Sequence, residues 1–225
     1  MKLVALVGFK GSGKDSAGSY LVENHGFVSF SFAESLKDAL SSIFCWDREL
    51  LEGKTEESRI WRESVDNWWA EKLEMPDLTP RKALQMVGTD LFRQHFHHDL
   101  WIHNIERKIT LLPPDSKVVI CDGRFPNEIN LARKFNGLVF RVQRGPDPVW
   151  IDCARYANGH TDELFQMGKH LKDIKDLQKN SREKMTTVYG VHESEWAWIG
   201  QPLDGVVQND GSLEDLYSQM EKVCL

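Results

Sequence analysis

Short runs of consecutive apolar residues recur along the chain. They cover residues 3–7 (LVALV), the start of 117–124 (KVVICDGR) and most of 138–144 (LVFRVQR). A strand that is buried on both faces has a continuous apolar sequence, so the segments 3–7, 117–124 and 138–144 are predicted to be inner strands of a parallel sheet. VSFSF at 28–32 and VVQ at 206–208 predict two further short strands.

Between these strands, apolar residues recur at helical spacing. The predicted helices span residues 14–25, 33–44, 79–95, 100–111, 126–135 and 162–184, and a last one begins at 212. Strands that alternate with helices imply an α/β domain of three layers with a parallel sheet and right-handed crossovers. Ligands in such domains bind at the carboxyl ends of the strands.

Two stretches interrupt this alternation. Residues 45–78 are dense in charge and tryptophan, and residues 146–190 contain a strongly charged helical segment. We interpret both as helical insertions into a single domain that covers residues 1–225. In the first insertion, Trp68 and Trp69 are expected to belong to a core.

Composition limits the classes of partner. The chain has 225 residues and a net charge of −6, from 28 Lys and Arg against 34 Asp and Glu. Stable binding to nucleic acid needs concentrated positive charge, so it is not expected. The four cysteines are scattered, which suits a reducing compartment. No apolar run approaches the roughly 20 residues that span a bilayer. We therefore expect a cytoplasmic protein without a membrane partner.

The segment after the first strand, GFKGSGKDS, carries the clearest chemistry. Its spacing is G-x-x-x-x-G-K, in which backbone N–H groups and the following helix N-terminus bind phosphate and the lysine reaches the transferred group. The residues expected to bind a nucleotide here are Gly8, Lys10, Gly11, Ser12, Gly13, Lys14, Asp15 and Ser16. Asp15 stands where the usual motif has Ser or Thr, so Ser16 is the expected hydroxyl ligand of magnesium. Asp15 either holds magnesium through water or caps the helix.

With this loop, several later motifs resemble those of the phage-type deoxynucleoside monophosphate kinases. They are FAESLKDAL (32–40), TPRKALQMVGTDLFRQHFHHDLWI (79–102), VVICDGRFPNEI (118–129), HESEW (192–196) and VVQNDGSLEDL (206–216). The resemblance implies the P-loop nucleoside monophosphate kinase fold and transfer of the γ-phosphate of ATP to a deoxynucleoside monophosphate, with Mg²⁺. It also implies a role in nucleotide supply for DNA synthesis, in the host cytosol if a phage encodes the chain.

The residues near the donor follow from strand ends and from the resemblance. Lys14 and Arg124 are candidate catalytic residues, because the transferring phosphoryl group needs positive charge around it. Asp122 either orients the water shell of magnesium, near Ser16, or stabilises a turn, and the resemblance favours the catalytic role. Arg144 closes a strand at the ligand edge, where its guanidinium plane suits stacking on adenine. The resemblance places Asn209 near the donor base.

The candidate acceptor-binding residues carry charge or amide groups. They are Lys37, Arg81, Gln85, Asp90, Arg93, Asn127 and Glu128. Arg81, at a helix start, suits a bidentate grip on a monophosphate, and Arg93 lies on roughly the same helical face. Residues 45–78 are where an acceptor-binding flap would lie. In the second insertion, Arg182 or Lys184 belongs either to a mobile lid or to a solvated helix.

The sequence is also compatible with other functions. The same loop serves kinases of other small phosphate acceptors, of the dephospho-coenzyme A or phosphomevalonate type, and nucleotide-binding modules without turnover. The histidines at 95, 97, 98 and 103 lack a matched ligand framework, so a metal site there is not expected. Of two similar segments, HESEW at 192–196 is preferred over His160 as the family element. The preferred base and the oligomeric state, a homodimer among the options, are left open.

Overall fold

The computed structural model describes residues 1–160 and 171–224. Within these residues, five strands form one sheet in the order β2-β3-β1-β4-β5. The strands are β1 (Lys2–Val7), β2 (Phe27–Phe30), β3 (Lys117–Ile120), β4 (Leu138–Gln143) and β5 (Gly205–Gln208). The β1–β3, β1–β4 and β4–β5 pairs are parallel, with Ala5 opposite Ile120 and Val139. The predicted parallel α/β sheet is confirmed.

The chain divides into two compact units. Unit 1 is Met1–Ser29 with Leu112–Leu225, and unit 2 is Phe30–Leu111. Unit 1 contains the sheet core, in which β1 is central and its residues Leu3–Val7 are at most 3% exposed. Complete burial on both faces explains why this strand is a continuous apolar run.

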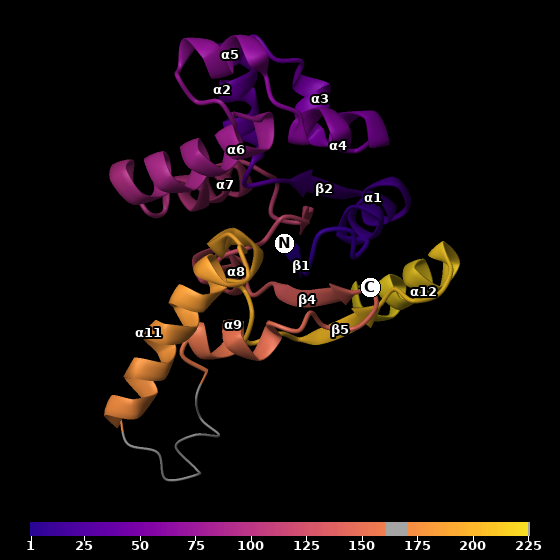
Figure 1. Ribbon diagram of the computed structural model, residues 1–225. Helices are drawn as coiled ribbons and strands as arrows, with labels where there is room; N and C mark the ends of the chain where they lie inside the picture. The colour runs from indigo at the N-terminus through magenta and orange to yellow at the C-terminus, as the bar shows by residue number, and fades with distance from the viewer. Residues whose placement is uncertain (161–170, 225) are drawn as a thin grey trace. The chain divides into compact units, whose positions relative to one another are not determined.

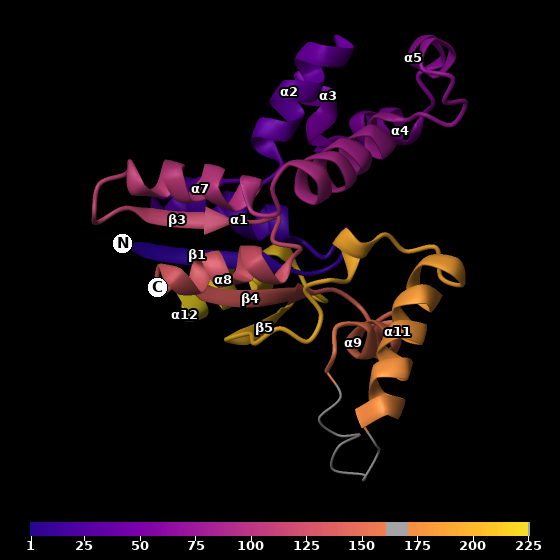
Figure 2. The same ribbon diagram turned by 90° about the vertical axis from the view of Figure 1, so that its left-hand side faces the viewer.

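Each face of the sheet in unit 1 is covered by helices (Figure 1 and Figure 2). Helices α1 (Lys14–His25) and α12 (Leu213–Cys224) pack against each other and cover one face, where Val4 and Leu6 belong to the core cluster. Helix α8 (Pro126–Lys134) contacts β1 and β4 on the other side. This arrangement brings the ends of β1, β3, β4 and β5 to one edge, with the turn from β1 into α1 in the middle.

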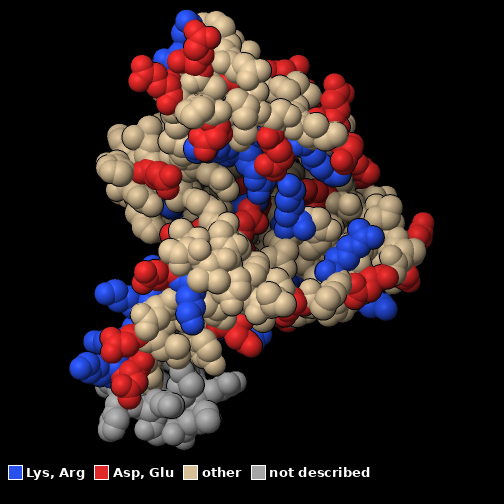
Figure 3. Space-filling view, in the orientation of Figure 1, with Lys and Arg blue, Asp and Glu red and all other residues tan. Residues whose placement is uncertain are grey.

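The remaining elements of unit 1 follow β4. They are α9 (Ile151–Ala157), α11 (Leu171–Thr187) and the short 3₁₀ helix η2 (Glu193–Glu195). Helix α11 packs along α9 and buries Ile174 and Met185. Acidic and basic side chains are interspersed along α11 (Figure 3), as the sequence KDIKDLQKNSREK requires. Residues 161–170, the first part of the predicted helix 162–184, lie outside the described residues.

Unit 2 is helical. Its elements are α2 (Glu34–Phe44), α3 (Arg48–Glu52), α4 (Glu56–Glu63), α5 (Asn67–Lys72), α6 (Pro80–Gln85), the π-helix η1 (Met86–Phe96) and α7 (Leu100–Thr110). Four of these helices begin at capping side chains: Asp47, Thr55, Asp66 and Thr79 each accept a hydrogen bond from a backbone N–H of the next turn. Such caps satisfy N–H groups that have no partner inside the helix.

The predicted helix over 79–95 is a composite in the structure. Thr79 caps it, accepting from the Lys82 N–H, and Pro80 takes its first position, as expected. From Met86 onward it continues as a π-helix, in which N–H groups bond five residues back. Apolar spacing alone does not distinguish the two helix types. A Cβ atom on Gly88 would lie 2.5 Å from a methyl carbon of Leu36, so η1 packs closely against α2 at this glycine.

Two expectations about local structure were wrong. The strand predicted over 117–124 ends at Ile120, so Asp122 and Arg124 lie in the segment after the strand. Trp68 does not lie in a core, because it is 59% exposed; only its neighbour Trp69 is anchored, donating from Nε1 to the Phe44 carbonyl at 2.9 Å. In the described ranges, no helix is long and apolar enough to cross a membrane.

Candidate active site

The turn from β1 to α1 has the conformation of a phosphate-binding loop. Gly8, Gly11 and Gly13 have φ values of +142°, +79° and +100°. Larger residues cannot replace two of them, because a Cβ on Gly8 would lie 2.3 Å from the Val142 carbonyl oxygen and one on Gly13 would lie 2.2 Å from Asn209 Nδ2. Successive N–H groups in such turns form a concave anion site, and the N-terminus of α1 adds positive potential.

Lys14 is folded back into this loop. Its Nζ donates to the carbonyl oxygens of Gly8 and Phe9, both at 2.8 Å. Burial, and then the positive charge of Arg124, lower the pKa of Lys14 below its ordinary value. Phosphate oxygens would offer this desolvated ammonium an anionic partner, which favours its charged form.

Asn209 braces the loop from behind. This residue is 7% exposed, donates from Nδ2 to the Ser12 carbonyl at 2.8 Å, and donates from its own N–H to the Gln143 carbonyl at 2.7 Å. It therefore ties the loop to the ends of β4 and β5. The side-chain amide is used by the loop backbone, so we assign Asn209 a positioning role rather than the expected contact with the donor base.

Phe9 is fixed by aromatic and cationic neighbours. Its ring lies 5.4 Å from that of Trp150 and 5.2 Å from that of Trp198. The buried guanidinium of Arg141 lies 5.4 Å from the Phe9 and Trp198 rings and forms an ion pair with Asp147. Cation–π contacts of this kind gain strength when desolvated. Arg141 is not distinguishable in the sequence, where it is one polar residue within a predicted strand.

A pocket of about 360 Å³ lies beside Phe9 and Lys10. Its lining is completed by Arg144, Pro146, Pro148, Trp150, Val191 and Glu195. Arg144 is exposed and Trp150 is partly buried. Apolar walls with a few charged groups at the rim are typical of small-molecule sites.

The segment after β3 is held by carboxylates. Glu128 is 3% exposed, and its Oε2 accepts from the N–H groups of Arg124 at 2.6 Å and Phe125 at 3.0 Å. This is a capping contact at the start of α8, where Pro126 takes the first position. The carboxylate of Glu128 is thus used by the backbone, and we assign it a positioning role instead of contact with the acceptor.

The guanidinium of Arg124 is held by the turn at residues 194–195. Its NH1 donates to Glu195 Oε1 at 2.5 Å and to the Ser194 carbonyl at 3.4 Å. Burial lowers the pKa of Arg124, but the charges of Glu195, Asp122 and Glu128 outweigh it, so the pKa lies above the ordinary value. The HESEW segment thus supplies a partner for Arg124. His192, the N-cap of η2, accepts from the Ser194 N–H and shapes this turn.

The oxygen donors near the loop fit magnesium. Ser16 lies half-buried in the first turn of α1, Asp15 is exposed beside it, and Asp122 follows β3 at the same sheet edge. Mg²⁺ prefers oxygen ligands, keeps several waters and takes the rest from substrate phosphates, so a hydroxyl and a carboxylate suffice. Among residues 1–160 and 171–224, no cluster of three His, Cys, Asp or Glu side chains forms a metal site.

Cys121 lies under the loop as a neutral thiol. Burial, then the charges of Asp15 and Asp122, raise its pKa well above the ordinary value. A Cβ on Gly18 would lie 2.1 Å from its sulfur atom, so the thiol packs directly against α1. Its position between β3 and α1 is structural, since a thiol with a raised pKa is a poor nucleophile.

The other expected acceptor residues lie in unit 2, apart from Asn127 on α8. Lys37 donates from Nζ to Glu52 Oε2 at 2.8 Å, and Arg81 pairs with Glu63 at 3.4 Å. Arg93 is buried, whereas Arg81 is half-buried, so the two arginines do not share one environment. Gln85 ends α6, and Asp90 is exposed on η1.

Arg182 of α11 points to other protein groups. It donates from NH2 to the Ala157 carbonyl at 3.3 Å, pairs with Glu193 at 3.8 Å and lies over the Trp196 ring. Lys184 is exposed. These contacts connect α11 to α9 and η2. The question of a mobile lid also involves residues 161–170, which lie outside the described residues.

The brace formed by Asn209 gives a first prediction. Asn209→Ala should lower the free energy of unfolding by about 1–3 kcal/mol, because the buried Ser12 carbonyl loses its donor. It should also weaken ATP binding, since the loop is no longer held behind Gly13. Thermal unfolding and calorimetric titration with ATP measure the two effects. The control is Asn24→Ala, an exposed asparagine of α1 that donates to the Tyr20 carbonyl. Unchanged ATP affinity in a destabilised Asn209 variant would argue against the positioning role.

Comparison with known proteins gives the family. No family model matches the chain. A putative deoxynucleotide monophosphate kinase of Acanthamoeba polyphaga mimivirus is 35% identical over 154 residues, which are 64% of this chain and 75% of that protein. The deoxynucleoside-5'-monophosphate kinase of Escherichia phage T5 is 48% identical over 61 residues, which are 27% of this chain and only 24% of that enzyme.

Among solved structures, a dephospho-CoA kinase from Campylobacter jejuni matches with TM-score 0.41 and 16% identity, covering 99% of this chain and 95% of that one. A gluconokinase from Sinorhizobium meliloti 1021 matches with TM-score 0.38 and 12% identity, covering 99% and 93%. These scores are too low to support an assignment, and none rests on them. The mimivirus match covers three quarters of its protein, and the predicted resemblance is confirmed: the chain belongs to the deoxynucleotide monophosphate kinase family.

Proposed function

We propose that this kinase transfers the γ-phosphate of ATP to a deoxynucleoside monophosphate, with Mg²⁺, giving ADP and a deoxynucleoside diphosphate. The observation that supports this most is the loop at residues 8–14, whose glycine conformations and folded-back lysine suit a triphosphate. An oxygen of the acceptor phosphate would attack the γ-phosphorus, and the bond from that phosphorus to the bridging oxygen of ADP would break. The product is a precursor for DNA synthesis.

The residues of unit 1 have distinct roles in this proposal. The loop N–H groups bind the β-phosphate, and Lys14 leaves the Gly8 and Phe9 carbonyls to bind the transferred group. Arg124, oriented by Glu195, offsets the charge around the γ-phosphorus. Ser16 and Asp122 would hold magnesium, which would offset negative charge on the outer phosphates.

The donor base belongs in the pocket beside Phe9 and Lys10. Arg144 and Trp150 offer flat groups that stack on a purine, and Pro146 and Pro148 add rigid apolar walls. Lys10, exposed at the rim, suits a phosphate oxygen. The acceptor takes Arg81 and Lys37 for its phosphate, and Gln85, Asp90, Arg93 and Asn127 are the remaining candidates for its nucleoside.

A substrate panel tests the proposal. ADP release, measured with a coupled assay, should be stimulated by at least one of the four deoxynucleoside monophosphates and should require Mg²⁺. The same assay with dephospho-coenzyme A, phosphomevalonate and gluconate should show background rates. Stimulation by one of those three acceptors alone would show that the acceptor belongs to another class of compound. ATP binding without stimulation by any acceptor would indicate a nucleotide-binding module.

A substitution at Lys14 should lower activity without lowering stability. Lys14→Met should lower turnover by roughly 10² or more, because one preorganised electrostatic contact typically contributes that much. It should leave the Tm unchanged or higher, since burial and Arg124 already disfavour the charged ammonium. The control is Lys222→Met on α12, an exposed position that should affect neither quantity. Near-normal turnover in folded Lys14→Met would remove the loop from the mechanism.

The order Asp15-Ser16 tests the placement of magnesium. Ser16→Ala should raise the Mg²⁺ concentration needed for half-maximal activity and cut turnover, whereas Asp15→Ser should be tolerated, because Asp15 is exposed and Ser16 half-buried. Titration of Mg²⁺ against activity in both variants measures this. If Asp15→Ser is inactive while Ser16→Ala works normally, the carboxylate is the ligand and the assignment of Ser16 is wrong.

A further inference from the structure

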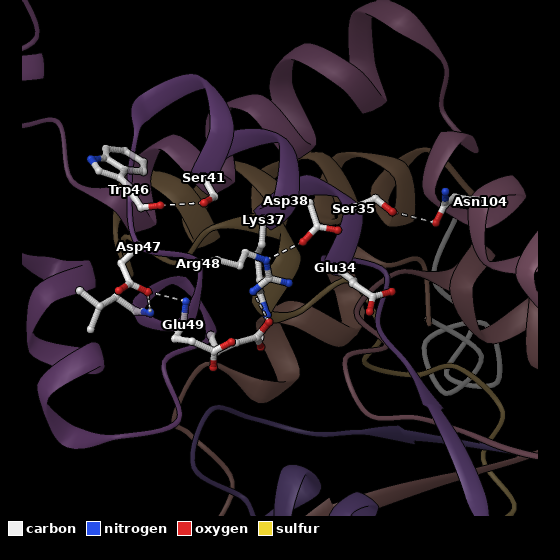
Figure 4. Close-up of polar contacts among 12 residues, drawn as sticks. Glu34, Ser35, Lys37, Asp38, Ser41, Trp46, Asp47, Arg48, Glu49 and Asn104 are labelled. Carbon is white, nitrogen blue, oxygen red and sulfur yellow. Dashed lines mark hydrogen bonds and ion pairs between the residues drawn. The ribbon is translucent and has the colours of Figure 1, made fainter.

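Unit 2 contains a chain of four alternating charges that joins two helices. Lys37 on α2 donates to Glu52 Oε2 at 2.8 Å, and Arg48, four residues before Glu52 on α3, donates to the other oxygen, Oε1. Arg48 also donates from Nε to Asp38 at 2.6 Å. Figure 4 shows Lys37 and Asp38 on one helix and Arg48 beside them. Two cations from different helices therefore converge on one carboxylate.

This carboxylate is well shielded from solvent. The side chains of Lys37 and Glu52 are 12% and 21% exposed, whereas that of Asp38 is 61% exposed. Burial raises the pKa of Glu52, but the hydrogen bonds from Lys37 and Arg48 lower it by more. The pKa therefore lies below its ordinary value. Glu52 is thus an anion whose two oxygens are each bound by a different cation.

The two cations differ in how they are attached to Glu52: Arg48 lies on the same helix, and Lys37 lies on another. Arg48 and Glu52 share one helix, which Gly53 ends at φ +69°, and Arg62 fixes this end by donating to the Glu52 carbonyl at 3.3 Å. Lys37 approaches from α2, so its contact with Glu52 joins two separate elements. An anion at this position would compete with Glu52 for Lys37 and for part of Arg48.

A phosphate monoester suits this position better than a carboxylate does. It carries up to two negative charges and three terminal oxygens, enough for the ammonium of Lys37 and the guanidinium fork of Arg48 at once. Neither Arg48 nor Glu52 was singled out by the sequence, because isolated charges in a charge-rich insertion look like a solvated surface.

We propose that Lys37 and Arg48 form a site for the acceptor's phosphate group, and that Glu52 occupies this site until the acceptor displaces it. The proposal rests on the proposed function in so far as the acceptor is a nucleoside monophosphate; the phosphate chemistry itself does not depend on it. Arg48 is then a further acceptor-binding residue, and Glu52 is an internal competitor that sets how tightly the acceptor binds.

The test is Glu52→Gln, which keeps the shape of the side chain and removes its charge. The matched control is Glu34→Gln, which removes one charge from α2 at a residue paired with Lys108, outside the network. Inorganic phosphate should raise the Tm of Glu52→Gln more than that of wild type or the control, each measured against its own phosphate-free value. The acceptor KM should fall about three- to tenfold in Glu52→Gln, with the ATP KM unchanged.

The variant Lys37→Gln tests the proposal in the opposite direction, because it removes a cation of the site instead of the competing carboxylate. It should give a smaller rise of Tm with phosphate than wild type shows, with the remaining rise due to the loop at residues 8–14. It also keeps the inference testable if Glu52→Gln does not fold. Equal phosphate responses in Glu52→Gln and Glu34→Gln, or a raised acceptor KM in Glu52→Gln, would mean that Glu52 only orients Lys37. If no deoxynucleoside monophosphate is phosphorylated, the proposed function fails, while the phosphate titration still decides this site.

Discussion

The turn between β1 and α1 is the constraint on which the site depends. β1 is buried on both faces, so its last residue delivers the chain to the sheet edge in a fixed direction. In the turn, Gly8 packs against the Val142 carbonyl and Gly13 packs against the Asn209 amide, and only glycine fits at these two positions. The same packing that excludes side chains from Gly8 and Gly13 leaves the N–H groups of this loop to line a concave anion site. The packing of the sheet core therefore also shapes the candidate anion site.

The cations proposed to bind substrate form contacts with oxygen atoms of the protein itself. Lys14 is bound by the Gly8 and Phe9 carbonyls, Arg124 by Glu195 and Lys37 by Glu52. Desolvated cations are costly unless paired, so these partners keep the substrate-free protein stable. A phosphate must compete with them, and the gain in binding is the difference between the new partner and the old one. In the proposed function, local cations of this kind let a chain with net charge −6 bind anionic substrates.

Much of the fold follows from local sequence patterns, because burial imposes a period on each element. Continuous apolar runs located β1, β3 and β4, and the Gly-rich segment located the loop, since its backbone conformation demands particular residues. The start of the helix at Thr79 and Pro80 was likewise predictable. The change to a π-helix at Met86 was not, because it depends on close packing at Gly88 rather than on any residue type in the helix.

The site was less predictable for a physical reason. A sequence shows which residue types carry charge, but not which partner each charge has. Asn209 and Glu128 carry amide and carboxylate groups suited to a substrate, yet both bond to the backbone of the protein. Arg141, Arg48 and Glu52 gain their significance from neighbours distant in sequence. A residue type shows what chemistry a side chain can perform, whereas its ion-pair and hydrogen-bond partners become visible only in the structure.

Hydrogen exchange with saturating ATP and Mg²⁺ tests the central claim, that the loop at residues 8–16 is the triphosphate site and is already formed without ligand. The backbone amides of this segment should exchange more slowly with ATP than without it, and those of β1 should be protected in both states. The same experiment on Lys14→Met should show little slowing in the loop. If ATP slows exchange elsewhere in the chain and leaves residues 8–16 unchanged, the triphosphate binds at another site and this account of the kinase is wrong.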